Sequence, residues 1–148
     1  MIIWQDLHHS ELSATLLYQL LALRNAVFIV EQNCPYQDID GIDLAGENRH
    51  LLGMQDNKLV AYARLLAPGS PASPVKIGRV IVASEARGLR LGNQLMSQAM
   101  ASCEAHWPQH RIRLSAQAHL GKFYARFGFN AVSDLYLEDN IPHVDMEN

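Results

Sequence analysis

The sequence is poor in cysteine and in net charge, and each shortage excludes a class of protein. Its 148 residues include two cysteines, Cys34 and Cys103. Two are too few for a disulfide framework and lack the C-x-x-C spacing of redox and metal motifs, so we expect reduced thiols. The formal net charge of −3 gives no global electrostatic attraction to nucleic acid or to an anionic membrane. We therefore expect no nucleic-acid partner.

Long apolar runs are also missing from the sequence. No such run reaches the roughly 18 residues that a membrane-spanning helix requires, and the N-terminal MIIWQDLHH has neither the basic nor the apolar region of a secretory signal. We expect a soluble, cytoplasmic protein without a membrane partner.

Metal-binding patterns are absent as well. The seven histidines are scattered, with no H-x-x-x-H spacing and no cluster with cysteine. The acidic stretch DIDGID, residues 38–43, begins like a calcium loop, but the twelfth position of such a loop requires glutamate and is Arg49 here. The sequence therefore predicts no metal site.

Apolar residues make up 49% of the chain and follow the periods of helices and strands. A chain of this length and composition is expected to form one domain over residues 1–148. Helical spacing and β-branched runs indicate where the elements lie. Strands are expected over residues 1–4, 50–55, 59–67, 75–83 and 111–117, two weak strands near 130–137 and 142–146, and helices over 10–32, 91–107 and 119–128.

The order of these segments indicates the fold class. One helix follows the first strand, and two more alternate with the later strands, so we expect an α/β protein with a mixed α+β sheet and helices packed on its faces. The sequence DNK at residues 56–58 predicts a tight hairpin turn. Residues 33–48, rich in turn formers and acids, are expected to be a loop with room for one short helical turn.

The junction between the strand over 75–83 and the helix over 91–107 carries the clearest chemical signal. It contains two arginines and two glycines in ARGLRLGNQLM, residues 86–96. The first amides of a helix have no intrahelical acceptors, and together with the helix dipole and guanidinium charge they favour a bound anion. On this pattern alone, an ordinary strand-to-helix turn with solvated arginines remains an equal alternative.

The stretch VIVASEARGLRLGNQLM, residues 80–96, resembles the coenzyme A-binding core of the GNAT superfamily of N-acetyltransferases, whose signature is Q/R-x-x-G-x-G/A. Arg87 stands at the first position and Gly92 at the last, while Arg90 replaces the middle glycine. Gly88 is expected to supply the tight turn, and Arg90 either projects outward or adds a phosphate contact. The resemblance implies the GNAT-like acyl-CoA N-acyltransferase fold, with a central, mostly antiparallel sheet and helices on both faces.

The same resemblance implies two sets of coenzyme A contacts. Backbone amides and small residues at the junction hold the pyrophosphate, and amides of the preceding strand hold the acetyl carbonyl and the pantetheine arm. The pyrophosphate residues are Arg87, Gly88, Arg90, Leu91, Gly92 and Asn93, and the strand residues are Ile81 and Val82.

A second motif, AQAHLGKFYARFGF at residues 116–129, is similar to the later Y-x-x-x-G-F motif of the superfamily. The resemblance implies that Tyr124 protonates the departing coenzyme A thiolate. Phe123 and Phe127 are four residues apart and are expected to face the core, with Tyr124 on another side of the helix. The alternative is a packed tyrosine with a satisfied hydroxyl.

A wider likeness covers residues 24–146. The segments FIVEQNCPYQDIDGID, AYARLL, IGRVIV, AQAHL and EDNIPHVDM resemble the ElaA-like branch of GNAT acetyltransferases. This resemblance implies acyl transfer without fixing the acceptor, and small enzymes of this kind often form homodimers.

Acetyl transfer to an amine also requires a proton acceptor, because an alkylammonium with a pKa near 10.4 must lose a proton before attack. Acidic residues 31–48, with no lysine or arginine among them, are expected to attract a cationic acceptor or to form a solvated loop. Glu31 is the candidate acceptor-side carboxylate. His119 is expected to be a helix cap or a base, and His143 a strand-edge or acceptor-pocket residue.

These observations predict an acetyl-CoA-dependent N-acetyltransferase that moves an acetyl group to a small-molecule or peptide amine by direct attack in a ternary complex. A covalent route through Cys34 has no adjacent base or cation to activate the thiol. Two alternatives stay open. One is a coenzyme A-binding sensor or interaction domain without catalysis, and the other is acyl transfer of another type on the same fold, such as signal-molecule synthesis.

Overall fold

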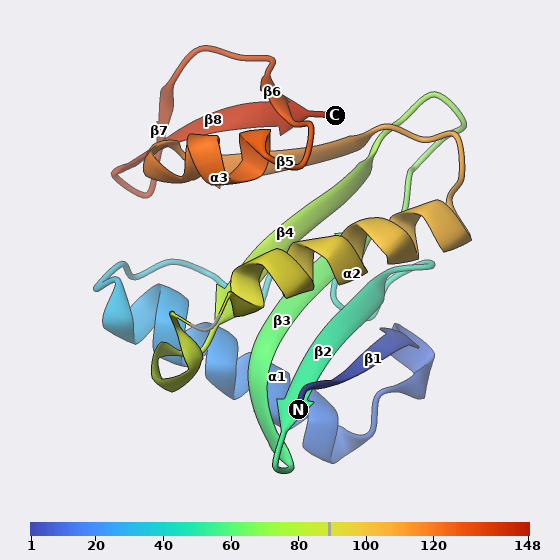
Figure 1. The fold of residues 1–148 in the computed structure, drawn as a ribbon, viewed down its shortest axis with the longest axis vertical. Helices are drawn as coiled ribbons and strands as arrows, with labels where there is room; N and C mark the ends of the chain where they lie inside the picture. The colour runs from blue at the N-terminus through green and yellow to red at the C-terminus, as the bar shows by residue number, and fades with distance from the viewer. Residues whose placement is uncertain (89) are drawn as a thin grey trace.

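Within residues 1–88 and 90–148, which the computed structural model describes, eight strands form one sheet (Figure 1). Their order is β1-β2-β3-β4-β5-β8-β6, and β7 also pairs with β8. Neighbours are antiparallel except β4 and β5, which are parallel. The strands are β1 (Ile3–His8), β2 (Arg49–Gln55), β3 (Lys58–Leu66), β4 (Val75–Val82), β5 (Ile112–Gln117), β6 (Asn130–Ala131), β7 (Tyr136–Glu138) and β8 (Ile141–Glu147).

Helices cover both faces of the sheet, as Figure 1 shows: α2 and α3 lie in front of the strands and α1 lies behind them. The expected mixed sheet with helices on both faces is confirmed. The helical segments are η1 (His9–Glu11), α1 (Ala14–Arg24), the π-helix η2 (Asn25–Glu31), η3 (Ser84–Ala86), α2 (Leu91–His106), η4 (Ala118–Leu120) and α3 (Gly121–Ala125).

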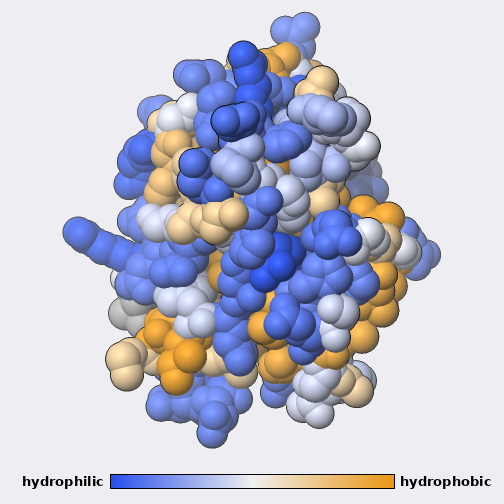
Figure 2. All heavy atoms as spheres, turned by 90° about the vertical axis from the view of Figure 1, so that its right-hand side faces the viewer, coloured by the Kyte–Doolittle hydropathy of each residue, from blue (hydrophilic) through white to orange (hydrophobic). Residues whose placement is uncertain are grey.

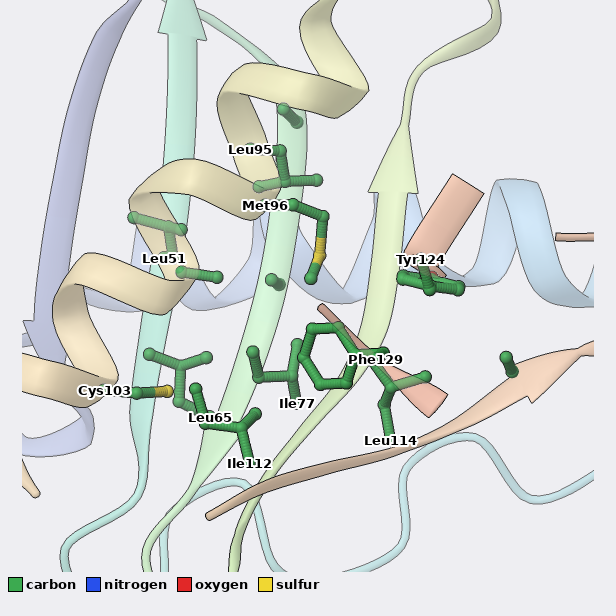
Figure 3. Packing of buried hydrophobic residues seen from close by; sticks show 14 of the residues in the cluster. Leu51, Leu65, Ile77, Leu95, Met96, Cys103, Ile112, Leu114, Tyr124 and Phe129 are labelled. Carbon is green, nitrogen blue, oxygen red and sulfur yellow. The ribbon is translucent and has the colours of Figure 1, made fainter. Parts of the chain in front are cut away.

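The two faces of the sheet bury two separate cores. Side chains alternate across a strand, so β3 directs Ala63 and Leu65 to the core under α2 and Tyr62 to the core under α1. Figure 3 shows the first core, where Leu95 and Met96 of α2 reach down to the strands. The strands between α1 and α2 are therefore buried on both faces.

Most elements lie where the sequence predicts them, with two shifts near the N-terminus. The first strand is β1 at Ile3–His8 rather than residues 1–4, because it pairs with residues 49–54 of β2. The first helix begins after Ser13, whose hydroxyl accepts a hydrogen bond from the Leu16 amide at 3.1 Å. The DNK turn is a tight turn with Asp56 and Asn57 both at positive φ.

The continuous helix Ala14–Glu31 is long and apolar enough, by length and composition, to be considered as a membrane span. The sequence inspection missed it because polar residues interrupt the apolar run. This is weak evidence of a span, because core helices and N-terminal signal sequences meet the same criterion. Here 17% of the segment is buried, and Leu16, Leu20 and Val27 pack against the sheet. Arg24 is fully buried within it, beside aspartates of the next loop.

On the face drawn in Figure 2, the surface is mostly hydrophilic, and the apolar patches are separated by polar residues. Scattered exposed apolar side chains of this kind are normal for folded proteins. The large apolar side chains that are at least half exposed include Tyr18, Val30, Ile39, Leu44, Leu135 and Leu137.

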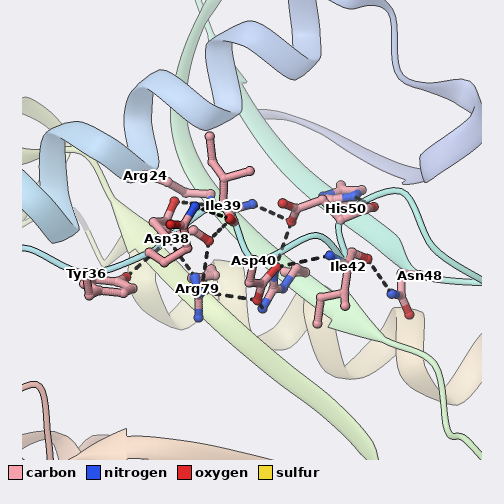
Figure 4. A network of polar contacts seen from close by, with 12 residues as sticks. Arg24, Tyr36, Asp38, Ile39, Asp40, Ile42, Asn48, His50 and Arg79 are labelled. Carbon is pink, nitrogen blue, oxygen red and sulfur yellow. Dashed lines mark hydrogen bonds and ion pairs between the residues drawn. The ribbon is translucent and has the colours of Figure 1, made fainter.

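A buried network of arginines and aspartates fixes the loop over residues 33–48 to the rest of the fold (Figure 4). Arg24 donates to Asp38 at 3.0 Å and to Asp43 at 2.6 Å. Arg64 of β3 donates to Asp43 at 3.0 Å and to Asp40 at 2.9 Å. The loop is therefore docked by ion pairs to α1, which precedes it, and to β3, which follows it.

Replacing Arg24 with methionine removes the charge from the middle of this network. Two aspartates then lose a buried partner, so we expect Arg24→Met to lower the free energy of unfolding by about 3 kcal/mol. Arg111→Met is the control, because its ion pair with Glu147 is solvent-exposed, and it should cost less than about 1 kcal/mol. Urea denaturation measures both, and equal losses would contradict the role of the buried network.

Candidate functional site

A cleft opens where β4 and β5 separate. The two strands pair only at Val75 with Ile112 and at Lys76 with Arg113. In Figure 1 they then cross the molecule in different directions. A cavity of about 970 Å³ occupies the opening, lined by residues 76–82 of β4 and by Leu114, Ser115 and Gln117 of β5. The cleft is thus built into the sheet.

A β-bulge in β4 accompanies this separation. The register between β3 and β4 shifts between Tyr62 and Arg64, and Arg79 adopts a left-handed φ of 53° at the bulge. Its guanidinium donates to the Asp38 carboxylate at 2.7 Å and to the Asp38 carbonyl at 3.1 Å. The docked loop therefore holds the bulge in place, and a bulged strand bends away from its neighbour.

Both faces of the sheet contribute to the walls of the cleft. On the face covered by α2 and α3 the lining includes Leu120, Phe123 and Tyr124, with the junction residues Arg87 and Gly92 nearby. The walls on the other face come from η2, the following loop and the β7–β8 hairpin, and they include Glu31, Gln32, Cys34, Tyr36, Glu138, Asp139 and His143. The cleft is therefore open to groups from two opposite sides of the sheet.

The junction before α2 has the backbone geometry of an anion site. Gly88 has a φ of +87°, which favours glycine. Arg90 caps α2 in the left-handed conformation, with φ 57° and ψ 21°, and its side chain makes no capping hydrogen bond. The amides of the first helical residues, Leu91 to Asn93, have no intrahelical acceptors. Leu89 of the motif lies outside the described residues.

Arg90 replaces the middle glycine of the signature, and its left-handed conformation shows how the turn is kept. The superfamily signature has glycine at this position, and glycine adopts positive φ without steric cost. Arginine takes the same conformation here and retains the turn, at a cost of about 1 to 2 kcal/mol. Its side chain is exposed.

Arg87 and Glu31 form an ion pair beside the cleft. Arg87 donates from Nη1 to Glu31 Oε2 at 2.6 Å and from Nη2 to Oε1 at 3.1 Å. Its Nε donates to the Val82 carbonyl at 3.0 Å. The two charged side chains are 43% and 41% exposed, so the pair contributes little to stability. Two predicted site residues are thus in direct contact.

Ile81 and Val82 of β4 are predicted to contact the thioester, and their backbone amides point in opposite directions. The Ala83 amide donates to the Val60 carbonyl of β3 at 2.8 Å. Hydrogen-bonded and non-hydrogen-bonded pairs alternate along an antiparallel ladder, so Ile81, opposite Tyr62, turns its amide toward β3. Val82, opposite Ala61, turns its amide toward the cleft. Of the two, only Val82 directs its backbone donor into the opening between β4 and β5.

Tyr124 is more buried than the sequence predicts. It is only 6% exposed and packs in the core with Phe129, while Phe123 and Phe127 are half-buried (Figure 3). Phe123 and Phe127 pack against this core as expected, with 5.4 Å between their ring centroids. The placement of Tyr124 on another side of the helix is wrong, because α3 ends at Ala125 and five residues are too few for separate helical faces. Within the described residues the Tyr124 hydroxyl has no protein hydrogen-bond partner, and burial raises the pKa of Tyr124 to about 12.

The acidic loop is also different from the expectation. Asp38, Asp40 and Asp43 are neutralised by Arg24, Arg64 and Arg79, so they provide neither a free negative field nor a solvated loop. Burial alone raises the pKa of Asp43, but hydrogen bonds and charge from Arg24 and Arg64 outweigh it and lower that pKa. Local sequence pattern could not predict these ion pairs, since the three arginines belong to α1, β3 and β4.

The two candidate histidines both line the cleft. His119 is exposed in η4, whereas His143 is buried in β8 and stacks on Tyr136 of β7. Sequence reasoning missed Tyr136 and the bulge residue Arg79. Arg79 lies in the segment IGRVIV, but that resemblance assigns no role to its side chain, and Tyr136 lies in none of the quoted segments. Arg79 lines the cleft, and the β7–β8 hairpin places Tyr136 against His143.

Comparison with known proteins identifies the family. The family described as "Acetyltransferase (GNAT) domain" matches residues 13–148. The chain belongs to the GNAT acetyltransferase family. It is 59% identical to protein ElaA of Escherichia coli strain K12 over 146 residues, which are 99% of this chain and 95% of that protein. The crystal structure of Escherichia coli ElaA superposes with a TM-score of 0.96 and 58% identity, covering 99% of each chain.

Two further solved structures share this fold. An acyl-CoA N-acyltransferase from Pseudomonas aeruginosa is 48% identical, with a TM-score of 0.95 and 99% of each chain covered. An aminoglycoside 6'-N-acetyltransferase complexed with coenzyme A has a TM-score of 0.74 at 13% identity, covering 99% of this chain and 96% of that one, which shows the fold alone. The predicted GNAT, ElaA-like resemblance is confirmed, and the family supports acyl transfer in general.

Backbone strain at Arg90 is open to a direct test. Arg90→Gly relieves the left-handed strain, and Arg90→Ala removes the same charge but keeps the Cβ. We expect the glycine variant to be more stable than the alanine variant by about 1 kcal/mol, since the flexibility of glycine offsets part of the gain. Thermal unfolding measures the difference. A glycine variant less stable than the alanine variant would contradict the conformation.

Proposed function

We propose that this protein is an acetyl-CoA-dependent N-acetyltransferase that transfers the acetyl group directly to an amine in a ternary complex. The observation that carries the proposal is the cleft between β4 and β5. It is lined on one face of the sheet by the junction before α2 and by Tyr124, and on the other by polar groups of η2 and the β7–β8 hairpin. Donor and acceptor then reach one reaction centre from opposite sides.

The junction is suited to the diphosphate of coenzyme A. The amides of Leu91, Gly92 and Asn93 point out of the start of α2, and the helix dipole adds positive potential there. Gly88 supplies the turn, and Arg87 and Arg90 supply charge. Gly92 has no side chain at the start of the helix, which leaves the backbone accessible to a ligand.

The free edge of β4 is suited to the pantetheine arm and the thioester. An extended arm adds to a strand edge through main-chain hydrogen bonds. The Val82 amide, directed toward the cleft, is the donor for the carbonyl oxygen as it gains negative charge, and Ile81 shapes the wall beside it.

Tyr124 is suited to the departing sulfur. Because burial raises the pKa of Tyr124 to about 12, the phenol keeps its proton throughout the neutral range. Its hydroxyl, without a protein partner in the described chain, is free to hydrogen-bond to the sulfur as the carbon–sulfur bond breaks. The thiolate then leaves as a thiol.

The Tyr124→Phe variant tests this role. We expect its kcat for amine acetylation to fall about 100-fold or more while acetyl-CoA binding is retained, because only the proton donor is lost. Tyr18→Phe, at an exposed tyrosine, is the control and should match wild type. Release of free thiol from acetyl-CoA with a panel of amines gives the rates.

A wild-type rate in Tyr124→Phe would remove the assigned acid. Tight acetyl-CoA binding without turnover of any amine would instead favour a coenzyme A sensor. Turnover that requires a longer acyl chain would favour a different acyl donor on the same fold.

The Arg87–Glu31 pair predicts competition at the junction. Glu31→Gln frees Arg87 and removes a negative charge, so we expect coenzyme A to bind about two- to fivefold more tightly. Glu104→Gln, an exposed carboxylate of α2, is the control, and isothermal titration calorimetry measures both affinities. Unchanged affinity with a fall in kcat would place Glu31 on the acceptor side instead.

A further inference from the structure

The acceptor side of the cleft contains one buried imidazole that the reaction so far leaves unused, His143 of β8. His143 pairs with Gln117 of β5, one residue along from the pair of Val144 with Ala116. Val144 and Ala116 lie in the core that contains Tyr124. Successive strand residues point to opposite faces, so His143 lies on the face of the sheet opposite Tyr124. Both residues line the same cleft.

Hydrogen bonding fixes which ring nitrogen of His143 is basic. Nδ1 lies 2.7 Å from the Ile141 carbonyl oxygen, which only accepts, so Nδ1 carries the hydrogen. In the neutral ring Nε2 therefore holds the lone pair, and it lies 3.4 Å from the Glu138 carboxylate. The Tyr136 ring stacks on the imidazole, with 6.0 Å between centroids and an interplanar angle of 24°.

The Nε2 lone pair and the Glu138 carboxylate are both acceptors, so together they favour a proton or another cation that binds to both. A proton on Nε2, or an ammonium hydrogen shared by Nε2 and Glu138, satisfies both acceptors. The imidazole is buried and the carboxylate is 55% exposed, so Glu138 reaches solvent where a cationic acceptor arrives.

The other ionisable groups near His143 are less suited to this task. Asp145 accepts from Tyr136 at 2.6 Å and from Arg113 at 3.0 Å, and these hydrogen bonds lower its pKa. The Cys34 thiol donates to the Asp139 carbonyl at 3.3 Å. Among the described residues, Glu138 and Tyr136 of β7 contact the His143 ring, and Asp145 lies two residues along β8. Asp139 and Cys34 line the same cleft.

We propose that His143 Nε2 is the base that takes a proton from the acceptor ammonium, with Glu138 stabilising the imidazolium that forms. This inference rests on the proposed N-acetyltransferase function and extends it to a substrate class, primary amines that are cationic in solution. His143 is thereby a catalytic residue, and Tyr136 is a positioning residue that fixes its ring.

The protons and electrons balance. The ammonium gives one proton to Nε2, and the neutral nitrogen forms a bond to the thioester carbonyl carbon. The carbon–sulfur bond then breaks, and its electron pair stays on sulfur, which takes the proton of the Tyr124 phenol. A second proton from nitrogen restores that phenol, and the proton on His143 passes to solvent.

The first test compares His143→Gln with His110→Gln. His110 also holds its Nδ1 on a backbone carbonyl, that of Ser73 at 2.8 Å, but it is not among the described residues that line the cleft. We expect His143→Gln to lower kcat/KM for an alkylamine about 100-fold or more, with the KM for acetyl-CoA unchanged. His110→Gln should match wild type. Equal rates in wild type and His143→Gln would overturn the proposal.

The second test varies the basicity of the acceptor. In wild type, kcat/KM for an alkylamine should rise with pH to a plateau in the neutral range. In His143→Gln it should keep rising toward the pKa of the amine, near 10.4, because only the amine that is already neutral then reacts. With a weakly basic amine such as an alkoxyamine, already neutral at the assay pH, the loss in His143→Gln should shrink to a few-fold. If His143→Gln lowers kcat/KM by the same factor for both amines, His143 does not remove the proton and its role is only structural.

The third test does not depend on turnover. Long-range ¹H–¹⁵N NMR of the ¹⁵N-labelled protein reports the tautomer of His143, and we expect hydrogen on Nδ1 at a pH where the ring is neutral. Hydrogen on Nε2 would overturn the proposal, because the nitrogen beside Glu138 would have no lone pair. If wild type binds acetyl-CoA and turns over no amine, the proposed function fails, and the tautomer still decides whether Nε2 is available as a base.

Discussion

The separation of β4 from β5 is the constraint on which the rest of the site depends. Two residue pairs join these strands before they diverge, and a sheet opened in this way leaves backbone donors of β4 without a neighbour. It also lets side chains from both faces reach one cleft, Tyr124 from under the α2 and α3 layer and His143 from the other. A continuous sheet would separate these groups, so the opening itself makes two-sided chemistry available.

Ion pairs to the neighbouring loop, rather than pairing with β5, stabilise the open edge of β4. Arg79 at the β4 bulge, Arg24 in α1 and Arg64 in β3 meet Asp38, Asp40 and Asp43 of a single loop. Each buried ion is compensated, which avoids the large desolvation cost of an isolated charge. Hydrogen bonds from Arg64, together with the charges of Arg64 and Arg79, also lower the pKa of Asp40 against the opposing effect of burial. The aspartates of this loop therefore stabilise the fold rather than attract a cationic acceptor.

Sequence reasoning gave the order of elements, the hairpin turn at Asp56 and Asn57, and the α2 junction, because these depend on local periodicity and turn chemistry. It did not give the face of α3 occupied by Tyr124, since a helix of five residues has no reliable periodicity. It also missed the partners of the acidic loop and the Arg87–Glu31 contact, which join residues 14 to 56 positions apart. Local rules therefore predicted the scaffold and the motif, and long-range pairing decided the charges at the site.

The most direct measurement of the central claim is a crystal structure of this protein with acetyl-CoA bound. We predict that the diphosphate lies on the amides of Leu91 to Asn93, that the pantetheine arm runs along β4 in the opening beside β5, and that the thioester carbonyl accepts from the Val82 amide with its sulfur toward Tyr124. Acetyl-CoA bound elsewhere, with the opening between β4 and β5 unoccupied, would contradict it.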